Sequence, residues 1–236
     1  MSISSRSSSA RGTTPGARLA ASAMFAVLLV GPVLAQARPA APARATVPAG
    51  WVVRPDADAM GHGDGATVSF VAMQPGWHVT TGPAAILYDS TRRATGNWRL
   101  EAVIHLFDPG ARAEGFGVFF GGANLASPTQ RYAYALVRRD GRALLKVREG
   151  ETTRTVREWA ANAAIPQWKP GPKGASVRYP LVVEARGDRV TVLVNNVSVL
   201  DAPRRELPTD GIVGLRINHA LNVHVETLTV TPLAAR

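Results

Sequence analysis

Two short patterns in the chain carry residue types that ligand binding or catalysis would use. Trp77-His78 follows a Pro-Gly turn, and Arg216, Asn218 and His219 lie at the end of an otherwise apolar run. Histidine exchanges protons near neutral pH, whereas guanidinium and amide groups bind hydroxyls and carbonyls through several N–H donors. A tryptophan ring adds an apolar platform. This combination is expected for a site that binds a polar ligand such as a sugar.

Each of these residues also has a purely structural interpretation. Trp77 is more typical of a core residue with His78 at its rim, and the Arg216 face is slightly more typical of a solvated strand. Tyr132 and Tyr134 alternate along one strand, either as a ligand-facing pair or as a buried pair, and Arg148 beside Lys146 is equally open. The candidate ligand-binding residues are Trp77, His78, Tyr132, Tyr134, Arg148, Arg216, Asn218 and His219, and the candidate catalytic residues among them are His78, Arg216 and His219.

Several other chemistries have no support in the sequence. The chain has no cysteine, which excludes disulfides, thiol catalysis and a lipoprotein anchor on this chain. Asp56, Asp58 and Asp64 lie in the segment PDADAMGHGDG, but Met60 occupies the third ligand place of an EF-hand loop. The motif H-E-x-x-H is absent. We therefore predict no cofactor, and leave open a structural calcium that binds backbone carbonyls.

The elements that position the candidates are predicted to be short β-strands. From Trp51 onward, runs of alternating apolar residues recur between Gly, Pro, Asn and Asp. The segment 115–150 is typical of a three-stranded meander, and its Asp140-Gly141 pair predicts a type I′ turn in which both residues have positive φ. In the longest run, Asn97–Phe107, one face carries Trp98, Leu100, Ala102, Ile104 and Leu106, and the opposite face carries Arg99, Glu101 and His105.

These patterns predict an all-β fold, an antiparallel two-sheet β-sandwich. We find no amphipathic helix after residue 37, and roughly a dozen short strands separated by turns favour two packed sheets. A long irregular connection, Trp159–Tyr179, carries two tryptophans, and connections of this length are usually functional or disordered. We expect Arg216, His219 and His78 to border one concave polar cleft with this connection as its rim. Arg216→Ala is then expected to abolish ligand binding with little change in thermal stability.

The first 37 residues have the pattern of a secretory signal peptide. Arginines precede the apolar run Leu19–Val30, and Ala35-Gln36-Ala37 fits a cleavage site. The run is too short to cross a bilayer and is followed by Pro32. We predict a signal peptide at 1–37, a Pro/Ala linker at 38–50 and a β-sandwich domain at 51–236, located in the periplasm or secreted, with no membrane span after cleavage.

The charge is strongly positive, at a formal +10. Three of the 27 basic residues precede the apolar run, so 24 basic residues face 17 acidic ones in the remaining chain. Because the basic residues are scattered at strand spacing without interleaved aromatics, we interpret them as a solvated surface and predict no nucleic-acid partner.

The order of the motifs resembles a known superfamily. Trp77-His78, Gly82-Pro83, Gly115–Gly122, Tyr132–Arg138 and Asp210–Leu215 (DGIVGL) occur in a sequence similar to the concanavalin A-like jelly-roll domains, and most similar to the 3-keto-disaccharide hydrolase domains. The resemblance covers most of 51–232. It implies a sandwich with a concave sheet able to hold saccharide.

The resemblance does not bring a catalytic set with it. Laminarinase-type relatives carry an E-x-D-x-x-E cluster, whereas Glu101, Glu184 and Glu226 are each alone on their strands. We therefore predict an exported carbohydrate-binding jelly-roll protein whose partner is a saccharide or glycoside. One alternative is a hydrolase or lyase acting on 3-keto glycosides, with His78 or His219 as the base and Arg216 as an oxyanion donor. The other is a structural or protein-interaction module of the cell envelope.

Overall fold

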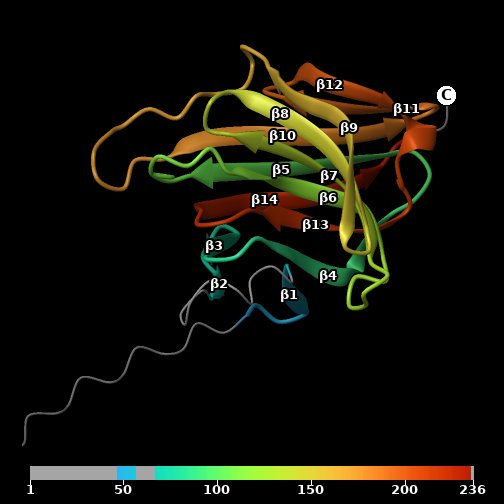
Figure 1. Cartoon of the computed structure of the whole chain (residues 1–236), viewed down its shortest axis with the longest axis horizontal. Coiled ribbons are helices and arrows are strands. Elements are labelled where there is room, and N and C mark those ends of the chain that lie inside the picture. The colour runs from blue at the N-terminus through green and yellow to red at the C-terminus, as the bar shows by residue number, and fades with distance from the viewer. Residues whose placement is uncertain (1–46, 57–66, 235–236) are drawn as a thin grey trace, which may run out of the picture. The chain divides into compact units, whose positions relative to one another are not determined.

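The computed structural model describes residues 47–56 and 67–234, and these ranges fold into two antiparallel seven-stranded sheets. The predicted all-β two-sheet sandwich is therefore confirmed (Figure 1). Sheet A has the order β1 (Trp51–Pro55), β4 (Ala85–Ala94), β13 (Gly211–Ile217), β6 (Gly115–Ala123), β7 (Arg131–Arg138), β8 (Arg142–Glu149), β9 (Thr152–Ala161). Sheet B has the order β12 (Val197–Pro203), β11 (Arg189–Val194), β10 (Val177–Arg186), β5 (Trp98–Leu106), β14 (Asn222–Pro232), β3 (Trp77–Thr81), β2 (Val68–Ala72).

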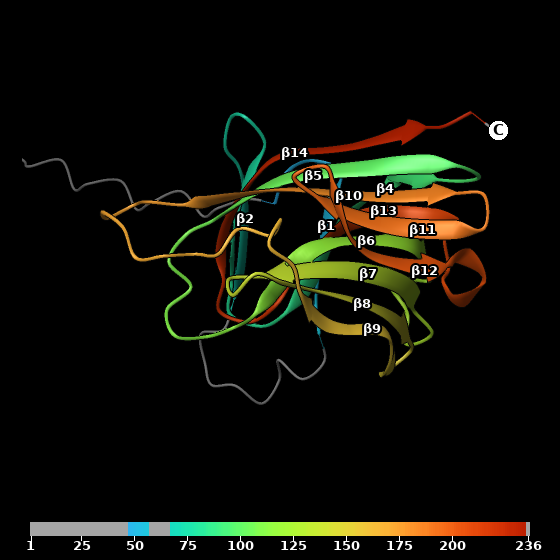
Figure 2. The ribbon, with the colours of Figure 1, turned by 90° about the horizontal axis from the view of Figure 1, so that it is seen from above.

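The hydrophobic core lies between the two sheets, which Figure 2 shows as separate layers, with β5, β10 and β14 on one side and β6 to β9 on the other. Strand β5 alternates as predicted, since Trp98, Leu100, Ile104 and Leu106 are at most 1% exposed while its polar residues face outward. Strand β13 also alternates, and its residues Val213, Leu215 and Ile217 lie in the inter-sheet core. Because side chains alternate with period two, each core residue is followed by one on the outer face of its sheet.

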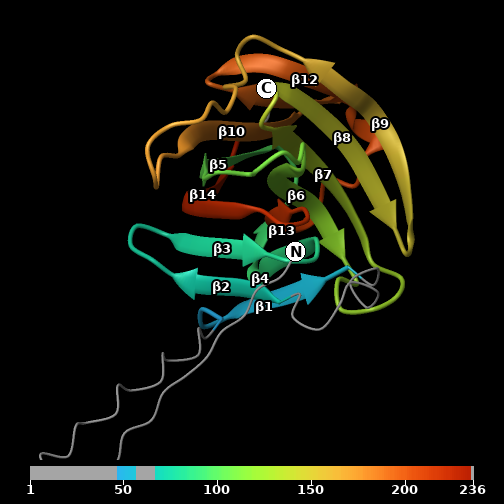
Figure 3. The same cartoon turned by 60° about the vertical axis from the view of Figure 1, so that its left-hand side comes forward.

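The outer face of sheet A carries another hydrophobic cluster of its own. Tyr132 and Tyr134 belong to it, so they lie outside the inter-sheet core and are nevertheless buried. Strands β8 and β9 curve strongly across one side of the molecule (Figure 3). The buried members of the cluster are Ile86, Tyr88, Phe119, Leu125, Tyr132, Tyr134, Leu136 and Leu144, with Trp159 and Ile212 packed against them.

The type I′ turn predicted at Asp140-Gly141 is wrong. Arg138 pairs with Arg142, which leaves a three-residue loop in which Gly141, with φ of 76°, has the positive φ and Asp140 does not. The two-residue turn with both φ values positive occurs instead at Asn195-Asn196, between β11 and β12. One glycine in the left-handed region suffices for the longer loop.

Two strands were not predicted, and the long connection is shorter than predicted. Strand β1 pairs with β4, and β9 continues to Ala161, so the irregular segment covers 162–176 rather than Trp159–Tyr179. The connection between β12 and β13 contains a 3₁₀ turn, Arg204–Glu206. No helix in the described ranges has both the length and the apolar character to cross a membrane. The predicted signal peptide, the linker up to residue 46, and Asp58, Met60, His62 and Asp64 lie outside the described residues.

Candidate functional site

A bidentate ion pair lies on the outer face of sheet A, within the hydrophobic cluster. Arg216 of β13 donates from Nη1 and Nη2 to the two carboxylate oxygens of Asp56, at 2.8 and 2.6 Å. Its Nε donates to Oδ1 of Asn218 at 3.1 Å. Side-chain exposure is 8% for Arg216 and 11% for Asp56. Two parallel N–H···O⁻ bonds fix both groups in one plane, the geometry in which arginine binds carboxylates most strongly.

Asp56 lies between two guanidinium groups. Arg148 of β8 places Nη1 3.6 Å from Oδ2 of Asp56, and its Nε donates to the Gly150 carbonyl at 2.9 Å. Burial raises the pKa of Asp56. The hydrogen bonds and charge of Arg216, together with the charges of Arg148 and His219, lower this pKa by more than burial raises it. The pKa therefore lies below its ordinary value of 3.8, and Asp56 is ionised at neutral pH.

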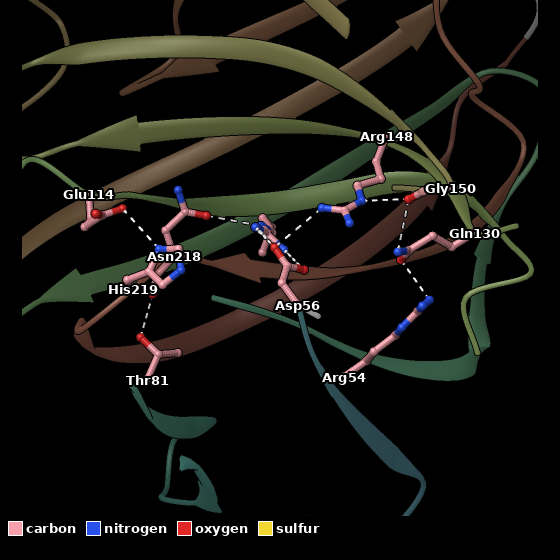
Figure 4. A network of polar contacts seen from close by, with 10 residues as sticks. Arg54, Asp56, Thr81, Glu114, Gln130, Arg148, Gly150, Asn218 and His219 are labelled. Carbon is pink, nitrogen blue, oxygen red and sulfur yellow. Dashed lines mark hydrogen bonds and ion pairs between the residues drawn. The ribbon is translucent and has the colours of Figure 1, made fainter. Parts of the chain in front are cut away.

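Arg54 extends this polar network along β1. It donates to Oε1 of Gln130 at 2.8 Å, to the Ser127 carbonyl at 3.1 Å and to the Leu125 carbonyl. Figure 4 shows the arrangement, with Arg54 and Gln130 on one side of Asp56 and Arg148 above it. These partners of Arg54 are neutral, so they orient its guanidinium without compensating its charge.

The other end of the network is more exposed. Nδ1 of His219 lies 3.9 Å from Oε2 of Glu114, an ion pair only when the imidazole is protonated. The backbone carbonyl of Asn218 accepts from Oγ1 of Thr81 at 2.6 Å (Figure 4). His219 is 40% exposed at its side chain, so this end of the site is open to solvent.

Two tyrosines form the aromatic part of the site. The rings of Tyr132 and Tyr134 lie 5.7 Å apart, and the Arg216 guanidinium lies 5.8 Å from the Tyr134 ring centroid. Arg216 stands opposite Gly117 of β6, and its guanidinium extends over β6 toward Tyr134 of β7. Burial raises the pKa of Tyr134 to about 12, so its hydroxyl stays protonated at neutral pH.

Six of the eight predicted ligand-binding residues are gathered on this one face. Arg216 and Asn218 come from β13 and its end, and the remaining four come from β7, β8 and the turn after β13. Their grouping on sheet A is a finding of the structure, whereas a role in binding stays a prediction. The six residues are Tyr132, Tyr134, Arg148, Arg216, Asn218 and His219.

Trp77 and His78 are not part of this site. They lie on β3 of sheet B, where Trp77 packs toward the core with its ring 4.9 Å from Trp51 and His78 faces outward. Adjacent residues of a strand point to opposite faces, so Trp77 cannot be the platform for a ligand that His78 binds. The expected single cleft joining Arg216 and His78 is therefore wrong, because the two residues lie on different sheets.

The connection 162–176 also lines a different hollow. Trp168 and the segment 170–175 border a cavity of about 300 Å³ together with Phe107 and Asn222 at the ends of sheet B strands. It is not the rim of the Arg216 site that the sequence suggested.

His78 instead belongs to a row of three histidines across β3, β14 and β5. His224 pairs with His78 and with His105, with ring centroids 6.3 and 6.0 Å away, and Nε2 of His105 lies 2.9 Å from the Glu226 carboxylate. Burial lowers the pKa of His78, the charge of His224 lowers it further, and Asn222 partly opposes this. Within 47–56 and 67–234, no group of three or more His, Asp or Glu side chains is arranged to hold a metal ion.

Asp56 is the central residue of this network, and sequence reasoning did not assign it to the site. It was considered only as part of a possible calcium loop, whereas its carboxylate binds Arg216, 160 positions later in the chain. Arg54, Glu114 and Gln130 were missed as well. The one available signal was an ionisable residue at the end of a short apolar run, and this signal is common at any strand end.

The two seven-stranded sheets form a galectin- and concanavalin A-like fold, as comparison with solved structures shows. The carbohydrate-binding module CBM66 from Bacillus subtilis is 15% identical, with a TM-score of 0.55, over 77% of this chain and 94% of that chain. A protein of unknown function with a galectin-like fold, also from Bacillus subtilis, is 11% identical, with a TM-score of 0.56, over 79% and 90%.

The exoplasmic/lumenal domain of VIP36 in its Ca²⁺/Man-bound form is 10% identical, with a TM-score of 0.55, over 79% of this chain and 84% of that chain. At such identities the similarity shows the fold alone. No family model matches the chain, and no curated protein does. The narrower resemblance to 3-keto-disaccharide hydrolase domains therefore stays a hypothesis.

Proposed function

We propose that this protein is a lectin-like module that binds saccharide on the outer face of sheet A. The observation that carries the proposal is the buried network of Asp56, Arg216 and Arg148 within a hydrophobic cluster. Removing three charged groups from water is costly, and well-packed apolar residues would often be at least as stable. Buried ionisable groups whose pKa is shifted by a specific charged partner, as that of Asp56 is by Arg216, are enriched at functional sites.

The network offers what a sugar requires. Arg216 has five N–H donors, and three of them are engaged by Asp56 and Asn218. The side-chain amide of Asn218 and the remaining N–H groups of Arg148 are suited to hydroxyl oxygens, and the Tyr134 ring is suited to the apolar face of a pyranose. Two structures of similar fold support the proposal by their descriptions, one as a carbohydrate-binding module and one as a mannose-bound form.

A panel of neutral and acidic oligosaccharides tests the proposal, with binding measured by calorimetry. We expect at least one saccharide to bind, and Asn218→Ala and Arg148→Ala to weaken that binding. Arg99→Ala on sheet B is the matched control, because it removes an outward-facing cation that is bound to carboxylates on the other face of the molecule. Absence of binding to every saccharide at millimolar concentration would show the proposal to be wrong.

His219 favours a second candidate function, elimination on a 3-keto glycoside. Its imidazole lies beside Glu114 and near Asn218, where a carboxylate can orient a base. The base would take the proton from the carbon next to the ketone, the electron pair would move onto the carbonyl oxygen, and an Arg216 N–H would stabilise this oxyanion. Return of the electrons would then break the glycosidic C–O bond and release the leaving group.

Release of the leaving group from a chromogenic 3-keto glycoside tests this candidate. We expect His219→Ala to remove the activity and His78→Ala, on the other sheet, to leave it unchanged. If both variants keep the wild-type rate, or if the wild type releases nothing, His219 is not a base for this reaction.

We also propose that the protein is exported, because residues 1–37 have the order of a cleavable leader. N-terminal sequencing of protein recovered outside the cytoplasm should begin near Gln36 or Arg38. Recovery of Met1 from that fraction would contradict the proposal.

A further inference from the structure

The site on sheet A holds more positive than negative charge. Among the described residues, its network contains the cations Arg54, Arg148 and Arg216, the buried carboxylate of Asp56 and, at its exposed end beside His219, the carboxylate of Glu114. Arg216 donates one hydrogen bond to each oxygen of the Asp56 carboxylate. Arg148 is 3.6 Å away from it and is held mainly by a neutral carbonyl, as Arg54 is. Uncompensated charge in a largely desolvated place is unfavourable until an anion joins it.

Lys146 adds a further cation to the same face. It precedes Arg148 by two residues on β8, so both side chains leave the same face of the strand, roughly 7 Å apart at their origins. Lys146 stands opposite Tyr134, and Arg148 stands opposite Tyr132. Lys146 is half-buried, and it makes no salt bridge with a residue in the described part of the chain.

A hydrogen-bond donor is also left over at this place. The hydroxyl of Tyr132 is buried and has no hydrogen-bond partner within the described ranges. Burial raises the pKa of Tyr132 above its ordinary value, so the group keeps its proton and can donate. Buried polar groups are nearly always satisfied in folded proteins, so this donor opposite Arg148 is available to a water molecule or a ligand atom.

From these observations we infer that the ligand of the sheet A site is an anionic saccharide whose carboxylate binds between Lys146 and Arg148, as in a uronic acid. A planar carboxylate matches the fork of the Arg148 guanidinium, as Asp56 already matches Arg216. The Lys146 ammonium supplies a charge at the side, and the pyranose ring lies toward Tyr134. This inference rests on the proposed saccharide binding and names the class of sugar.

Calorimetry with matched trisaccharides tests the inference on the mature chain. The ligands are trigalacturonate, its methyl ester, which keeps the skeleton and removes the charge, neutral galactotriose, and a sulfated trisaccharide. The proteins are the wild type, Lys146→Gln and Lys173→Gln. Lys173 is an exposed lysine of the connection 162–176, so both substitutions lower the net charge equally.

We expect trigalacturonate to bind at least about tenfold more tightly than its methyl ester, the effect of one charge-assisted hydrogen bond. Lys146→Gln should remove most of this difference, and Lys173→Gln should keep it. Equal loss in both variants would overturn the inference, since it would show general attraction to a basic protein. A Lys146-dependent preference for the sulfated sugar would overturn the assignment of a carboxylate.

The same experiment separates this inference from the proposed function. If acid, ester and neutral sugar bind equally and Asn218→Ala weakens all three, saccharide binding stands and the acidic class is wrong. If none of the four sugars binds the wild type, the inference of a uronic acid is wrong, and the wider saccharide panel decides the saccharide-binding proposal.

Discussion

The outer faces of the two sheets both arise from the alternation of side chains along a strand, but their charged side chains are buried to different degrees. On sheet A, the side chains of Asp56, Arg148 and Arg216 are about 10% exposed. On sheet B, Arg99 binds Glu184 and Glu101 with exposures of 22 to 44%. The neighbours explain the difference. The sheet A charges lie among large aromatic side chains, whereas Glu101 and Glu184 stand opposite threonines.

This comparison shows which polar face carries information about function. An exposed ion pair between strands contributes little and needs no function to explain it. A buried ion pair costs stability unless its geometry is excellent, so its presence calls for another cause. Both faces carry arginines paired with carboxylates, and the exposed fraction of these side chains distinguishes the two faces.

The largest expected effect comes from removing one partner of the buried pair. Arg216→Ala should lower the free energy of unfolding by about 3 kcal/mol, because Asp56 stays buried with Arg148 as its remaining partner. Urea unfolding measures this loss. The burial of Arg216 thus corrects the sequence-based expectation that this substitution leaves stability nearly unchanged.

The paired substitution Arg216→Met with Asp56→Leu provides the control. It removes both charges and should recover most of the stability, since no unpaired charge remains. A double variant as unstable as Arg216→Ala would show that packing, rather than charge, holds this part of sheet A.

The next effect is a pH dependence that belongs to Asp56. Its pKa in the folded protein lies below the ordinary 3.8, so its stabilisation is present above about pH 4 and is lost as the pH falls through the folded pKa. Unfolding of the wild type and Asp56→Asn should differ by a constant amount at pH 5 to 7 and by less toward pH 2. A difference that stays constant down to pH 2 would contradict the ionised Asp56.

Arg99→Ala on sheet B should have a smaller effect, of at most about 1 kcal/mol, because its ion pairs are exposed to water and screened by salt. The same urea titration measures it, and the loss should shrink further in 1 M NaCl. A loss as large as that of Arg216→Ala would remove the distinction between the two faces.

The smallest expected effect concerns His78. Burial lowers its pKa below 6.5, so the folded protein favours the neutral ring; this contribution is present above pH 6.5 and is lost as the pH falls through the folded pKa. His78→Gln should therefore flatten the stability profile just below pH 6.5, with no change above pH 7. Thermal unfolding at half-unit pH steps measures this, and an unchanged profile would contradict the direction of the shift.

The sequence predicted the local parts of this structure and not the distant ones. The inward residues of β5 and the shared face of Arg216 and Asn218 follow from period two, which any short segment displays. The pair of Asp56 and Arg216 depends on the order β1, β4, β13, and no spacing rule predicts which distant strands become neighbours. Strand β9 was missed because this edge strand is mostly exposed and lacks a continuous apolar face.

The two final strands have a consequence for how the chain folds as it is made. β13 lies between β4 and β6, and β14 lies between β5 and β3, so the two strands that come after all the other described strands in the sequence fill gaps near the middle of both sheets. Until they emerge, the nascent chain carries four strands with unpaired edges, which are templates for association with other chains. Closure is therefore a late event between distant segments, and such topologies fold slowly. Until Gly211–Pro232 has been made, these edges stay open to pairing with other chains.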